Sequence, residues 1–251
     1  MTDEVTWIGH AATLVEIDGV RVLADPLLTR RIGHLRRRGP LPDAGVRRCD
    51  LVVVSHAHND HLHRRSLRRV AAASPGVPVV VPRGAAAYVL GLGLGVVIEV
   101  SPGDDVEVAG VRLHVTDALH HGGRGRRDRG STETVGYVVE RAGRRCYLAG
   151  DTDLFEAMSA LGPIDLACIP IFGWWKKLGP GHLDPESAAE AVARVDPQRV
   201  LPIHWGTYAP EDLGLVTGWL AEPGARFARA LTERGLGDRL LRLEPGQTAP
   251  W

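Results

Sequence analysis

Short apolar runs rich in valine recur along most of the chain, separated by glycine, proline and charged residues. Runs of this length and composition predict β-strands rather than helices. Three pairs of runs are joined by two-residue turns typical of β-hairpins, namely Asp18-Gly19, Ala109-Gly110 and Ala142-Gly143. The expected strands cover residues 5–16, 20–24, 50–54, 77–81, 96–100, 106–108, 111–116, 135–140, 144–148, 165–170, 199–203 and 240–243.

Helical patterns lie between the strands. Asp184 and Pro185 are typical of a helix start, the first as N-cap and the second as first helical residue, and Ser66 can cap an earlier helix. The expected helices cover residues 66–73, 84–90, 154–161 and 184–195, and one or two more, broken at Pro223-Gly224, follow residue 210. The strand–helix–strand order in the first half is typical of an α/β fold.

Residues 29–45 show no hydrophobic period and are rich in arginine, glycine and proline. We expect an exposed charged loop here, and a mobile flap that meets an anionic substrate is the second interpretation. His34, within the loop, is expected at the surface. The arginines of this stretch are Arg30, Arg31, Arg36, Arg37 and Arg38.

Composition is that of an ordinary globular protein. The 251 residues are 44% hydrophobic, which is enough for one large α/β domain over residues 1–251. The 30 lysines and arginines balance the 30 aspartates and glutamates, so a bulk electrostatic partner such as duplex nucleic acid is not expected. Any charged partner must therefore be recognised locally.

Neither a targeting segment nor a membrane span is expected from the sequence. The first residues are acidic and precede no apolar leader core, and no run approaches the ~18 apolar residues of a membrane span. We therefore expect a cytoplasmic protein. Cys49, Cys146 and Cys168 lack a CxxC spacing and flank or lie in expected strands, which indicates buried free thiols.

The densest polar chemistry follows the apolar strand that ends at Val54. His56, His58, Asp60 and His61 come next, and packing would gain nothing from such residues. In extended backbone, His56 and His58 point the same way, whereas Asp60 and His61 fall where the chain must turn. This spacing predicts a single loop that could serve two metal ions.

Other candidate ligands stand just past later strands. His120, Asp151 and His204 each follow an expected strand, and the edge beyond the strand ends is where an α/β sheet places its ligand crevice. We therefore expect them to meet the histidine loop. Asp25 also ends a strand, and it could either orient a ligand histidine or simply open the turn before Pro26.

Basic and aromatic residues near these strand ends are candidates for substrate contact. Residues 122–130 form a basic, glycine-rich loop, for which flexibility is favoured over specific binding. Arg124 is its best substrate candidate because it lies near His120. Trp174 and Trp175 precede two lysines, which suits an apolar wall with anion-attracting neighbours. A loop packed over the core is the slightly favoured interpretation of the tryptophans.

The order of these motifs resembles the metallo-β-lactamase superfamily, from residue 5 to about residue 210. The HxHxDH motif stands at His56 to His61. Further segments are similar to the branch that contains the N-acyl-phosphatidylethanolamine phospholipase D enzymes and the ascorbate-phosphate lactonase-like proteins. They are Gly9-His10-Ala11, Asp25-Pro26, His58-Asn59-Asp60-His61, Ala149-Gly150-Asp151-Thr152, Pro163-Ile164-Asp165-Leu166, His182-Leu183-Asp184-Pro185-Glu186 and Ile203-His204-Trp205-Gly206-Thr207.

The resemblance implies an αββα sandwich of two mixed sheets with outer helices, and a site for two divalent metal ions. Zinc is the first choice for a nitrogen-rich ligand set, and manganese or iron would also be compatible. Carried over residue by residue, the ligands are His56, His58 and His120 for the first metal, Asp60, His61 and His204 for the second, and Asp151 bridging both.

One ligand could be either of two adjacent histidines, because that branch has His-Trp where this chain has His120-His121. The register of Gly123-Arg124 favours His120. The branch also has Leu-Trp-Gly where this chain has Thr134-Val135-Gly136, and loss of the tryptophan argues against a substrate with a long acyl chain.

The implied activity is hydrolysis by a hydroxide that bridges the two ions. Asp60 and Asp151 belong to the implied catalytic set, His182 could contact substrate or protonate a leaving group, and His10 is expected behind the ligands. The leading hypothesis is a phosphodiester or phosphate-bearing small molecule or lipid as substrate. The alternative is a lactone or other carboxylic ester, and a metal-binding scaffold or a nuclease is less favoured.

Overall fold

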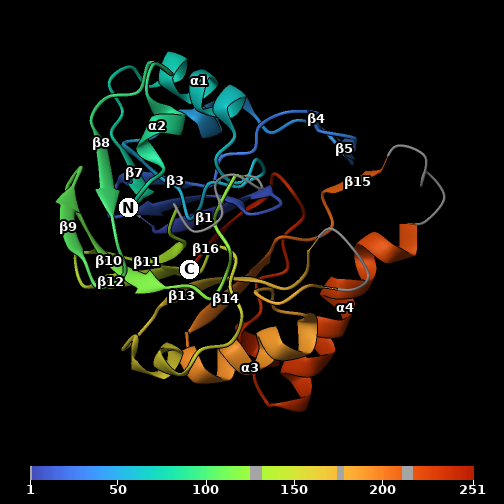
Figure 1. Cartoon of the computed structure of the whole chain (residues 1–251). Helices are drawn as coiled ribbons and strands as arrows, with labels where there is room; N and C mark the ends of the chain where they lie inside the picture. The colour runs from blue at the N-terminus through green and yellow to red at the C-terminus, as the bar shows by residue number, and fades with distance from the viewer. Residues whose placement is uncertain (1, 125–131, 174–177, 211–216) are drawn as a thin grey trace.

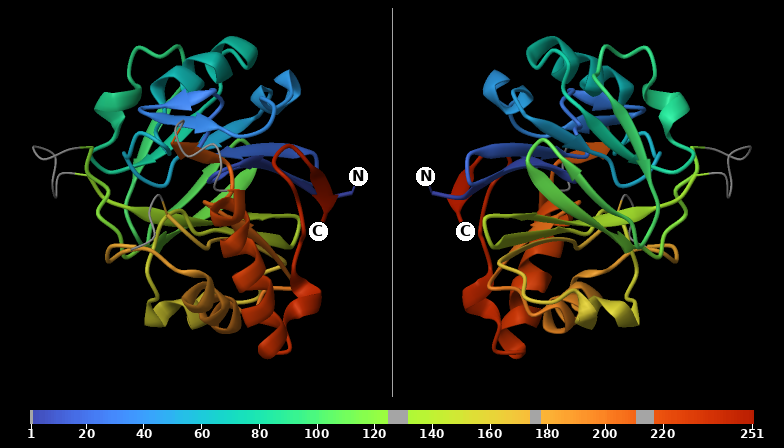
Figure 2. Two further views of the ribbon diagram at one scale, coloured as in Figure 1. Left: turned by 90° about the vertical axis from the view of Figure 1, so that its right-hand side faces the viewer. Right: turned by 90° about the vertical axis from the view of Figure 1, so that its left-hand side faces the viewer.

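Two β-sheets pack face to face in the middle of the structure, and helices cover the outer face of each (Figure 1). The computed structural model describes residues 2–124, 132–173, 178–210 and 217–251. Seen from either side, the sheets form the middle layers, with α1 and α2 beyond one and α3 and α4 beyond the other (Figure 2). The predicted αββα sandwich of mixed sheets is therefore confirmed.

The first sheet has seven strands in the order β16-β1-β2-β3-β6-β7-β8. Its β16, β1, β2 and β3 pair antiparallel, whereas β3, β6, β7 and β8 run parallel. The carboxyl ends of these parallel strands lie at one edge of the sheet, where the histidine loop begins. The strands are β1 (Glu4–Gly9), β2 (Ala12–Ile17), β3 (Val20–Ala24), β6 (Leu51–Val53), β7 (Val79–Pro82), β8 (Val97–Val100) and β16 (Thr248–Pro250).

The second sheet has six strands in the order β14-β13-β12-β11-β10-β9, of which β12, β13 and β14 are parallel. A separate three-stranded sheet has the order β15-β5-β4. The strands of the second sheet are β9 (Asp105–Val108), β10 (Val111–Asp117), β11 (Val135–Arg141), β12 (Arg144–Leu148), β13 (Leu166–Pro170) and β14 (Arg199–Ile203). Those of the small sheet are β4 (Arg31–Ile32), β5 (Leu35–Arg37) and β15 (Tyr208–Pro210).

The helices are short except for one near the C-terminus. α3 starts as predicted, because Asp184 accepts a hydrogen bond from the Ser187 amide at 2.7 Å and Pro185 follows as first helical residue. No helix in the described part of the chain is both long and apolar enough to cross a membrane. The α-helices are α1 (Arg64–Ala73), α2 (Ala86–Val89), α3 (Pro185–Val195) and α4 (Thr217–Glu233), and 3₁₀ turns cover Ala44–Arg47, Glu156–Ala160 and Gly237–Arg239.

Three apolar clusters fill the spaces between the layers. One lies between the two sheets, a second between the first sheet and α1 and α2, and a third between the second sheet and α3 and α4. Trp7 stacks on Trp205 with 5.4 Å between ring centroids, which ties β1 to the turn after β14. The three cysteines are buried and free, as predicted.

The three predicted hairpin turns are confirmed. Strands β2 and β3, β9 and β10, and β11 and β12 pair antiparallel directly across them. Both central residues of each turn have positive φ, as a type I′ turn requires.

The prediction of one strand over residues 5–16 is wrong. The chain reverses at Gly9, with φ of 120°, and at His10, with φ of 54°, so that Trp7 pairs with Thr13 on the next strand. Apart from Gly9 and His10, residues 7–12 are apolar, so the composition of a strand continues across the turn and hides it in the sequence. The reversal also presents His10 at the end of β1.

The loop predicted over residues 29–45 contains two short strands and the start of a 3₁₀ turn. Strands β4 and β5 form a hairpin, and β5 pairs with β15, which lies far away in the sequence. His34 is exposed, as predicted, but Arg37 is buried at 5% exposure. Its guanidinium donates to the carbonyls of Ile8 and Pro40, at 2.6 and 2.8 Å. Because pairing between distant segments leaves no local period, the sequence pattern misses this sheet.

Two predicted helix features differ in the structure. The N-cap of α1 is His63, whose side chain accepts from the Ser66 amide, so Ser66 lies inside the helix. Residues 154–161 contain only a short 3₁₀ turn.

The C-terminal prediction is also corrected. α4 continues through Pro223 without a break, and the ring of Trp205 packs so closely on Gly224 that a Cβ there would lie 2.3 Å from it. Proline has no backbone N–H to donate, which weakens the helix at Pro223. The contact between Trp205 and Gly224 supports the helix at that point. Residues 240–243 meet β14 only through an isolated bridge at Leu240, and the last strand is β16.

Candidate metal centre

Loops that follow strands of both sheets converge at one edge of the sandwich. His56, His58, Asp60 and His61 lie on the loop after β6, and the other predicted ligands follow β10, β12 and β14. The structure brings all seven together, in groups whose donor atoms lie within 4.8 Å of one another. The remaining three are His120, Asp151 and His204.

Asp25 organises the start of the histidine loop. One of its carboxylate oxygens accepts the Ser55 amide at 2.8 Å and the other accepts the Ser55 hydroxyl at 2.6 Å. The second oxygen also lies 2.7 Å from Nδ1 of His61, which leaves Nε2 of that ring directed at the centre. Gly150 brings the end of β12 against this loop, because a Cβ at its φ of 63° would lie 2.5 Å from the Ser55 Cβ.

The first group of donors consists of His56, His58 and His120. Nδ1 of His58 lies 2.9 Å from Nε2 of His56 and 3.2 Å from Nε2 of His120. His120 Nδ1 donates to the Gly181 carbonyl at 2.8 Å, which orients the ring. His121 is exposed, so the tertiary structure presents His120 rather than its neighbour to the group.

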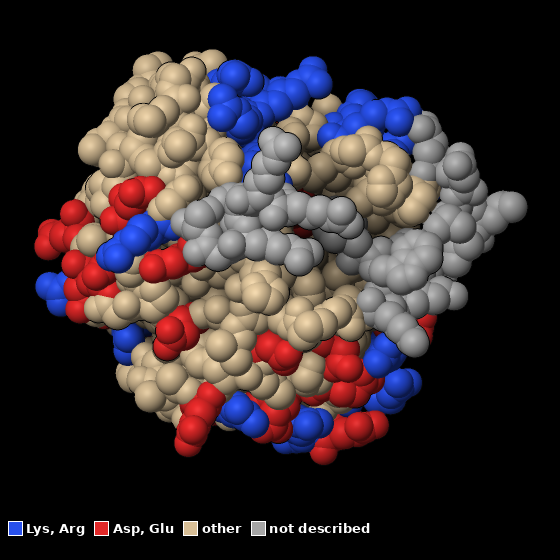
Figure 3. Space-filling view, in the orientation of Figure 1, with Lys and Arg blue, Asp and Glu red and all other residues tan. Residues whose placement is uncertain are grey.

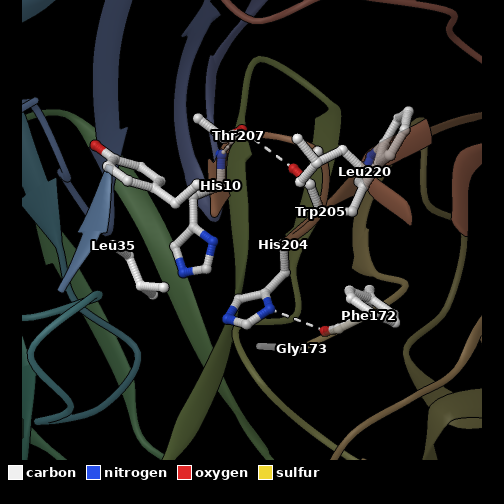
Figure 4. Close-up of a pocket in the computed structure, with 10 residues that line it drawn as sticks. His10, Leu35, Phe172, Gly173, His204, Trp205, Thr207 and Leu220 are labelled. Atoms are coloured by element: carbon white, nitrogen blue, oxygen red, sulfur yellow. Dashed lines mark hydrogen bonds between the residues drawn. The ribbon is translucent and has the colours of Figure 1, made fainter. Parts of the chain in front are cut away.

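The second group consists of Asp60, His61, His204 and His10. Oδ2 of Asp60 lies 2.9 Å from Nε2 of His10, 3.5 Å from that of His204 and 3.6 Å from that of His61. His204 Nδ1 donates to the Phe172 carbonyl at 2.8 Å, and the His10 and His204 rings lie side by side (Figure 4). His10 is thus placed against Asp60, behind the second group.

Asp151 stands between the two groups. Its Oδ2 lies 3.3 Å from Nε2 of both His61 and His204, 3.9 Å from that of His56 and 4.0 Å from that of His120. In the described part of the chain, Oδ1 of Asp151 and Nε2 of His61 are buried and lack a hydrogen-bond partner. Buried polar atoms without partners are costly, and a cation would satisfy both.

Burial controls the protonation of the first group. Removal from water lowers the pKa of His56 and His58, and lowers that of His120 to about 4. These imidazoles are therefore neutral at pH 7. Their nitrogen lone pairs are available to a metal without loss of a proton.

Ion pairing controls the second group. Burial raises the pKa of Asp60 and Asp151, but the neighbouring histidines outweigh it and hold both well below the ordinary range. Burial likewise lowers the pKa of His204, yet Asp151 outweighs it and raises the value to about 9. The pKa of His61 is raised well above its usual value, chiefly by Asp151 and Asp25 against the effect of burial. A metal in this group would displace protons.

His182 reaches the same centre from the start of α3. Its Nε2 lies 3.9 Å from Oδ2 of Asp151, and its side chain is 24% exposed. His182 is therefore the most exposed of the histidines around Asp151.

Arg124 contacts the histidine loop itself. Its guanidinium donates to Asn59 Oδ1 at 2.5 Å and to the Leu62 carbonyl at 3.1 Å, and it lies over the Tyr88 ring. These contacts hold the histidine loop. The other predicted substrate residues, Trp174 and Trp175, lie outside the described residues.

Sequence reasoning missed Ser55, Arg37 and Thr207. Ser55 connects Asp25 to the loop, Arg37 anchors the Gly9 turn, and the Thr207 hydroxyl accepts the His10 amide at 2.7 Å. A signal existed only for Ser55, which directly precedes the motif, and for Thr207, which follows His204 closely. Nothing local marks Arg37.

The space behind His10 and His204 is too small for a substrate. It measures about 10 Å³, roughly the room that one water needs (Figure 4). A reactant must therefore approach the centre from another side.

Known proteins are similar to this chain in sequence and in fold. The family described as "Beta-lactamase superfamily domain" matches residues 20–205. A UPF0173 metal-dependent hydrolase of Methanopyrus kandleri is 32% identical over 252 residues, covering 97% of this chain and 98% of that protein. The N-acyl-phosphatidylethanolamine-hydrolyzing phospholipase D 1 of Caenorhabditis elegans is 31% identical over 233 residues, covering 81% of this chain and 64% of that enzyme. The solved structure of Igni18, a metallo hydrolase from Ignicoccus hospitalis, has a TM-score of 0.75 and 24% identity, with 100% of this chain and 99% of that chain covered.

Proposed function

The chain belongs to the β-lactamase superfamily of metal-dependent hydrolases, and we propose that it hydrolyses phosphodiesters or other phosphate-bearing molecules at a site for two divalent ions. The observation that carries the proposal is the position of Asp151. One of its carboxylate oxygens, Oδ2, lies 3.3 to 4.0 Å from nitrogens of both histidine groups. A carboxylate in that place suits two cations better than one.

The donor set fits zinc at both positions, with manganese or iron as alternatives, because it combines imidazole nitrogens with carboxylate oxygens. We assign His56, His58 and His120 to the first ion and Asp60, His61 and His204 to the second, with Asp151 between them. His10 and Asp25 act from behind, by orienting Asp60 and His61.

Bound divalent ions would lower the pKa of a shared water toward neutrality and polarise the bond to be cleaved. The chain's own residues prepare this chemistry. Asp60 and Asp151 stay ionised and concentrate negative charge at the centre. His182 lies beside Asp151 on the exposed side, where its Nε2 could give a proton to a leaving group.

Phosphate chemistry is favoured over ester chemistry by the relatives and by local charge. The C. elegans relative is a phospholipase D, although this chain spans under two thirds of it. Arginine side chains gather over α1 and near β4 and β5 on the face of the molecule that Figure 3 shows, and this positive charge suits an anionic substrate.

The test is a side-by-side hydrolysis panel with zinc-loaded protein. The panel contains an activated phosphodiester, a sugar-phosphate lactone, an acyl-homoserine lactone and N-acyl-phosphatidylethanolamine. We expect turnover of the phosphodiester, and elemental analysis of the same sample should find close to two metal ions per chain. Turnover of lactones alone would replace the proposed substrate class, and fewer than one ion under metal-replete conditions would rule out a dinuclear site.

Arg124→Ala is expected to weaken zinc binding by about 10- to 100-fold, because the histidine loop loses its contacts through Asn59 and the Leu62 carbonyl. Chelator competition measures the affinity. Arg112→Ala, which removes an exposed arginine from β10, is the matched control and should leave the affinity unchanged. A raised KM with normal zinc affinity would instead support the substrate contact predicted from the sequence.

A further inference from the structure

We propose that α1 and the neighbouring segment 84–98 form a surface that docks on an anionic lipid membrane. Exposed arginines of α1 would meet the lipid headgroups, and exposed apolar side chains of segment 84–98 would enter the interface between headgroups and acyl chains. The inference goes beyond the proposed function, because binding of this surface to lipid needs no turnover at the metal centre.

The charge of this region has one sign. Between Asp60 and Glu99 the chain contains five arginines and neither an aspartate nor a glutamate, although positive and negative residues balance over the whole chain. A region without carboxylates attracts anions from solution without local repulsion. The arginines are Arg64, Arg65, Arg68, Arg69 and Arg83, of which Arg65, Arg68 and Arg83 are exposed.

Segment 84–98 contains no charged residue, yet part of it faces solvent. Leu90 and Val96 are the two most exposed large apolar side chains in the described part of the chain, at 62% and 61% exposure. Val89 and Leu92 already fill the apolar cluster beneath α1 and α2, so the core does not take up Leu90. Figure 3 shows an area without charged side chains over α2, next to the arginines over α1. Apolar and basic surface therefore meet on one face.

Segment 84–98 packs along one side of α1. Nη1 of Arg64 donates to the Tyr88 carbonyl at 2.7 Å, and a Cβ at Gly93 would lie 3.6 Å from the Ala71 Cβ. Arg64, Arg68 and Ala71 are spaced as i, i+4 and i+7, so they share one side of the helix. Arg68 thus lies between the two contacts, beside the uncharged segment.

This surface adjoins the metal centre. The guanidinium of Arg124 lies 5.2 Å from the centroid of the Tyr88 ring, and it also donates to Asn59 and to the Leu62 carbonyl of the histidine loop. Docking would therefore hold the histidine loop near the membrane surface, where lipid headgroups are concentrated.

An anionic membrane fits this surface better than a second copy of the chain does. In a two-fold dimer through this face, the arginines of both copies would meet and repel each other. A lipid surface offers anions to all exposed arginines at once, and it takes up apolar side chains without a matching pocket. The apolar and the electrostatic contributions add, so neither has to be large by itself.

The test is sedimentation of the purified chain with lipid vesicles. One set of vesicles contains equal parts of phosphatidylcholine and phosphatidylglycerol, and the other contains phosphatidylcholine alone. We expect about tenfold tighter binding to the mixed vesicles, and added salt should weaken it. Arg65→Gln combined with Arg68→Gln should lower binding to the mixed vesicles about tenfold, because two attractive charges are lost. Leu90→Ser combined with Val96→Ser should have a similar effect of about tenfold, because less apolar surface leaves water.

Arg112→Gln combined with Arg229→Gln is the matched control, because it removes the same charge from exposed positions on β10 and α4. It should bind vesicles as wild type does. Absence of binding, or binding that both surface variants leave unchanged, would overturn the inference. A dimer in solution that Leu90→Ser with Val96→Ser separates into monomers would assign the surface to a second copy and would also overturn it. None of these measurements uses a substrate, so failure of the proposed hydrolysis would leave their outcome unchanged.

Discussion

Replacement of Asp151 by asparagine is expected to lower kcat/KM for a phosphodiester by at least about a thousandfold, on the order of 4 kcal/mol in transition-state free energy. Asparagine has nearly the same shape, so the change removes charge rather than volume. Oδ2 of Asp151 is the carboxylate oxygen that lies 3.3 Å from both His61 and His204. Without its charge, two neighbouring cations would repel each other across the centre, and we expect the metal content to fall from two ions to at most one.

The measurement combines kinetics, elemental analysis and far-ultraviolet circular dichroism of the same protein. Asp117→Asn is the matched control, because Asp117 ends β10 shortly before His120 but its side chain is exposed and outside the donor groups. It should keep both ions and full activity. The opposite outcome is an Asp151→Asn variant that folds and loses activity but still binds two ions. That outcome would contradict the bridging role and would instead indicate that Asp151 takes part in the chemical step.

The neighbours His120 and His121 offer a second large and cleanly controlled effect. His120→Ala is expected to remove one metal ion per chain and to reduce kcat/KM by about a hundredfold or more. Nε2 of His120 lies 3.2 Å from Nδ1 of His58, and its other nitrogen is held by the Gly181 carbonyl. Both contacts prepare the ring for a ligand role.

His121→Ala is the control for that experiment, since His121 is exposed and belongs to none of the donor groups. We expect its metal content and activity to stay within about twofold of wild type, as for other surface changes. If His121→Ala lost the ion and His120→Ala kept it, the ligand assignment would have to move by one residue. Zinc titration of the two variants distinguishes these outcomes without reference to any substrate.

Much of the local structure could be predicted because short-range chemistry specifies it. The two-residue turns at Asp18-Gly19 and Ala142-Gly143 adopt the positive φ values that close a hairpin, and Asp184 caps α3 through its own next turn. Buried strands of valine and leucine are recognisable for the same reason. The turn at Gly9 was missed because apolar residues continue directly on both sides of Gly9 and His10.

For the centre, the sequence by itself determined the residue types and their order, from His56 through His204, and with them the family and the donor chemistry. Only the tertiary structure decided which of His120 and His121 faces the group, that Asp25 holds Ser55 and His61, and that Arg124 contacts the loop. It alone joined β5 to β15, so that Leu35 and Pro210 line one cavity together with Asp60. The physical reason is that ligand identity resides in single side chains, whereas orientation, burial and charge coupling arise between segments far apart in the chain, where no local pattern records them.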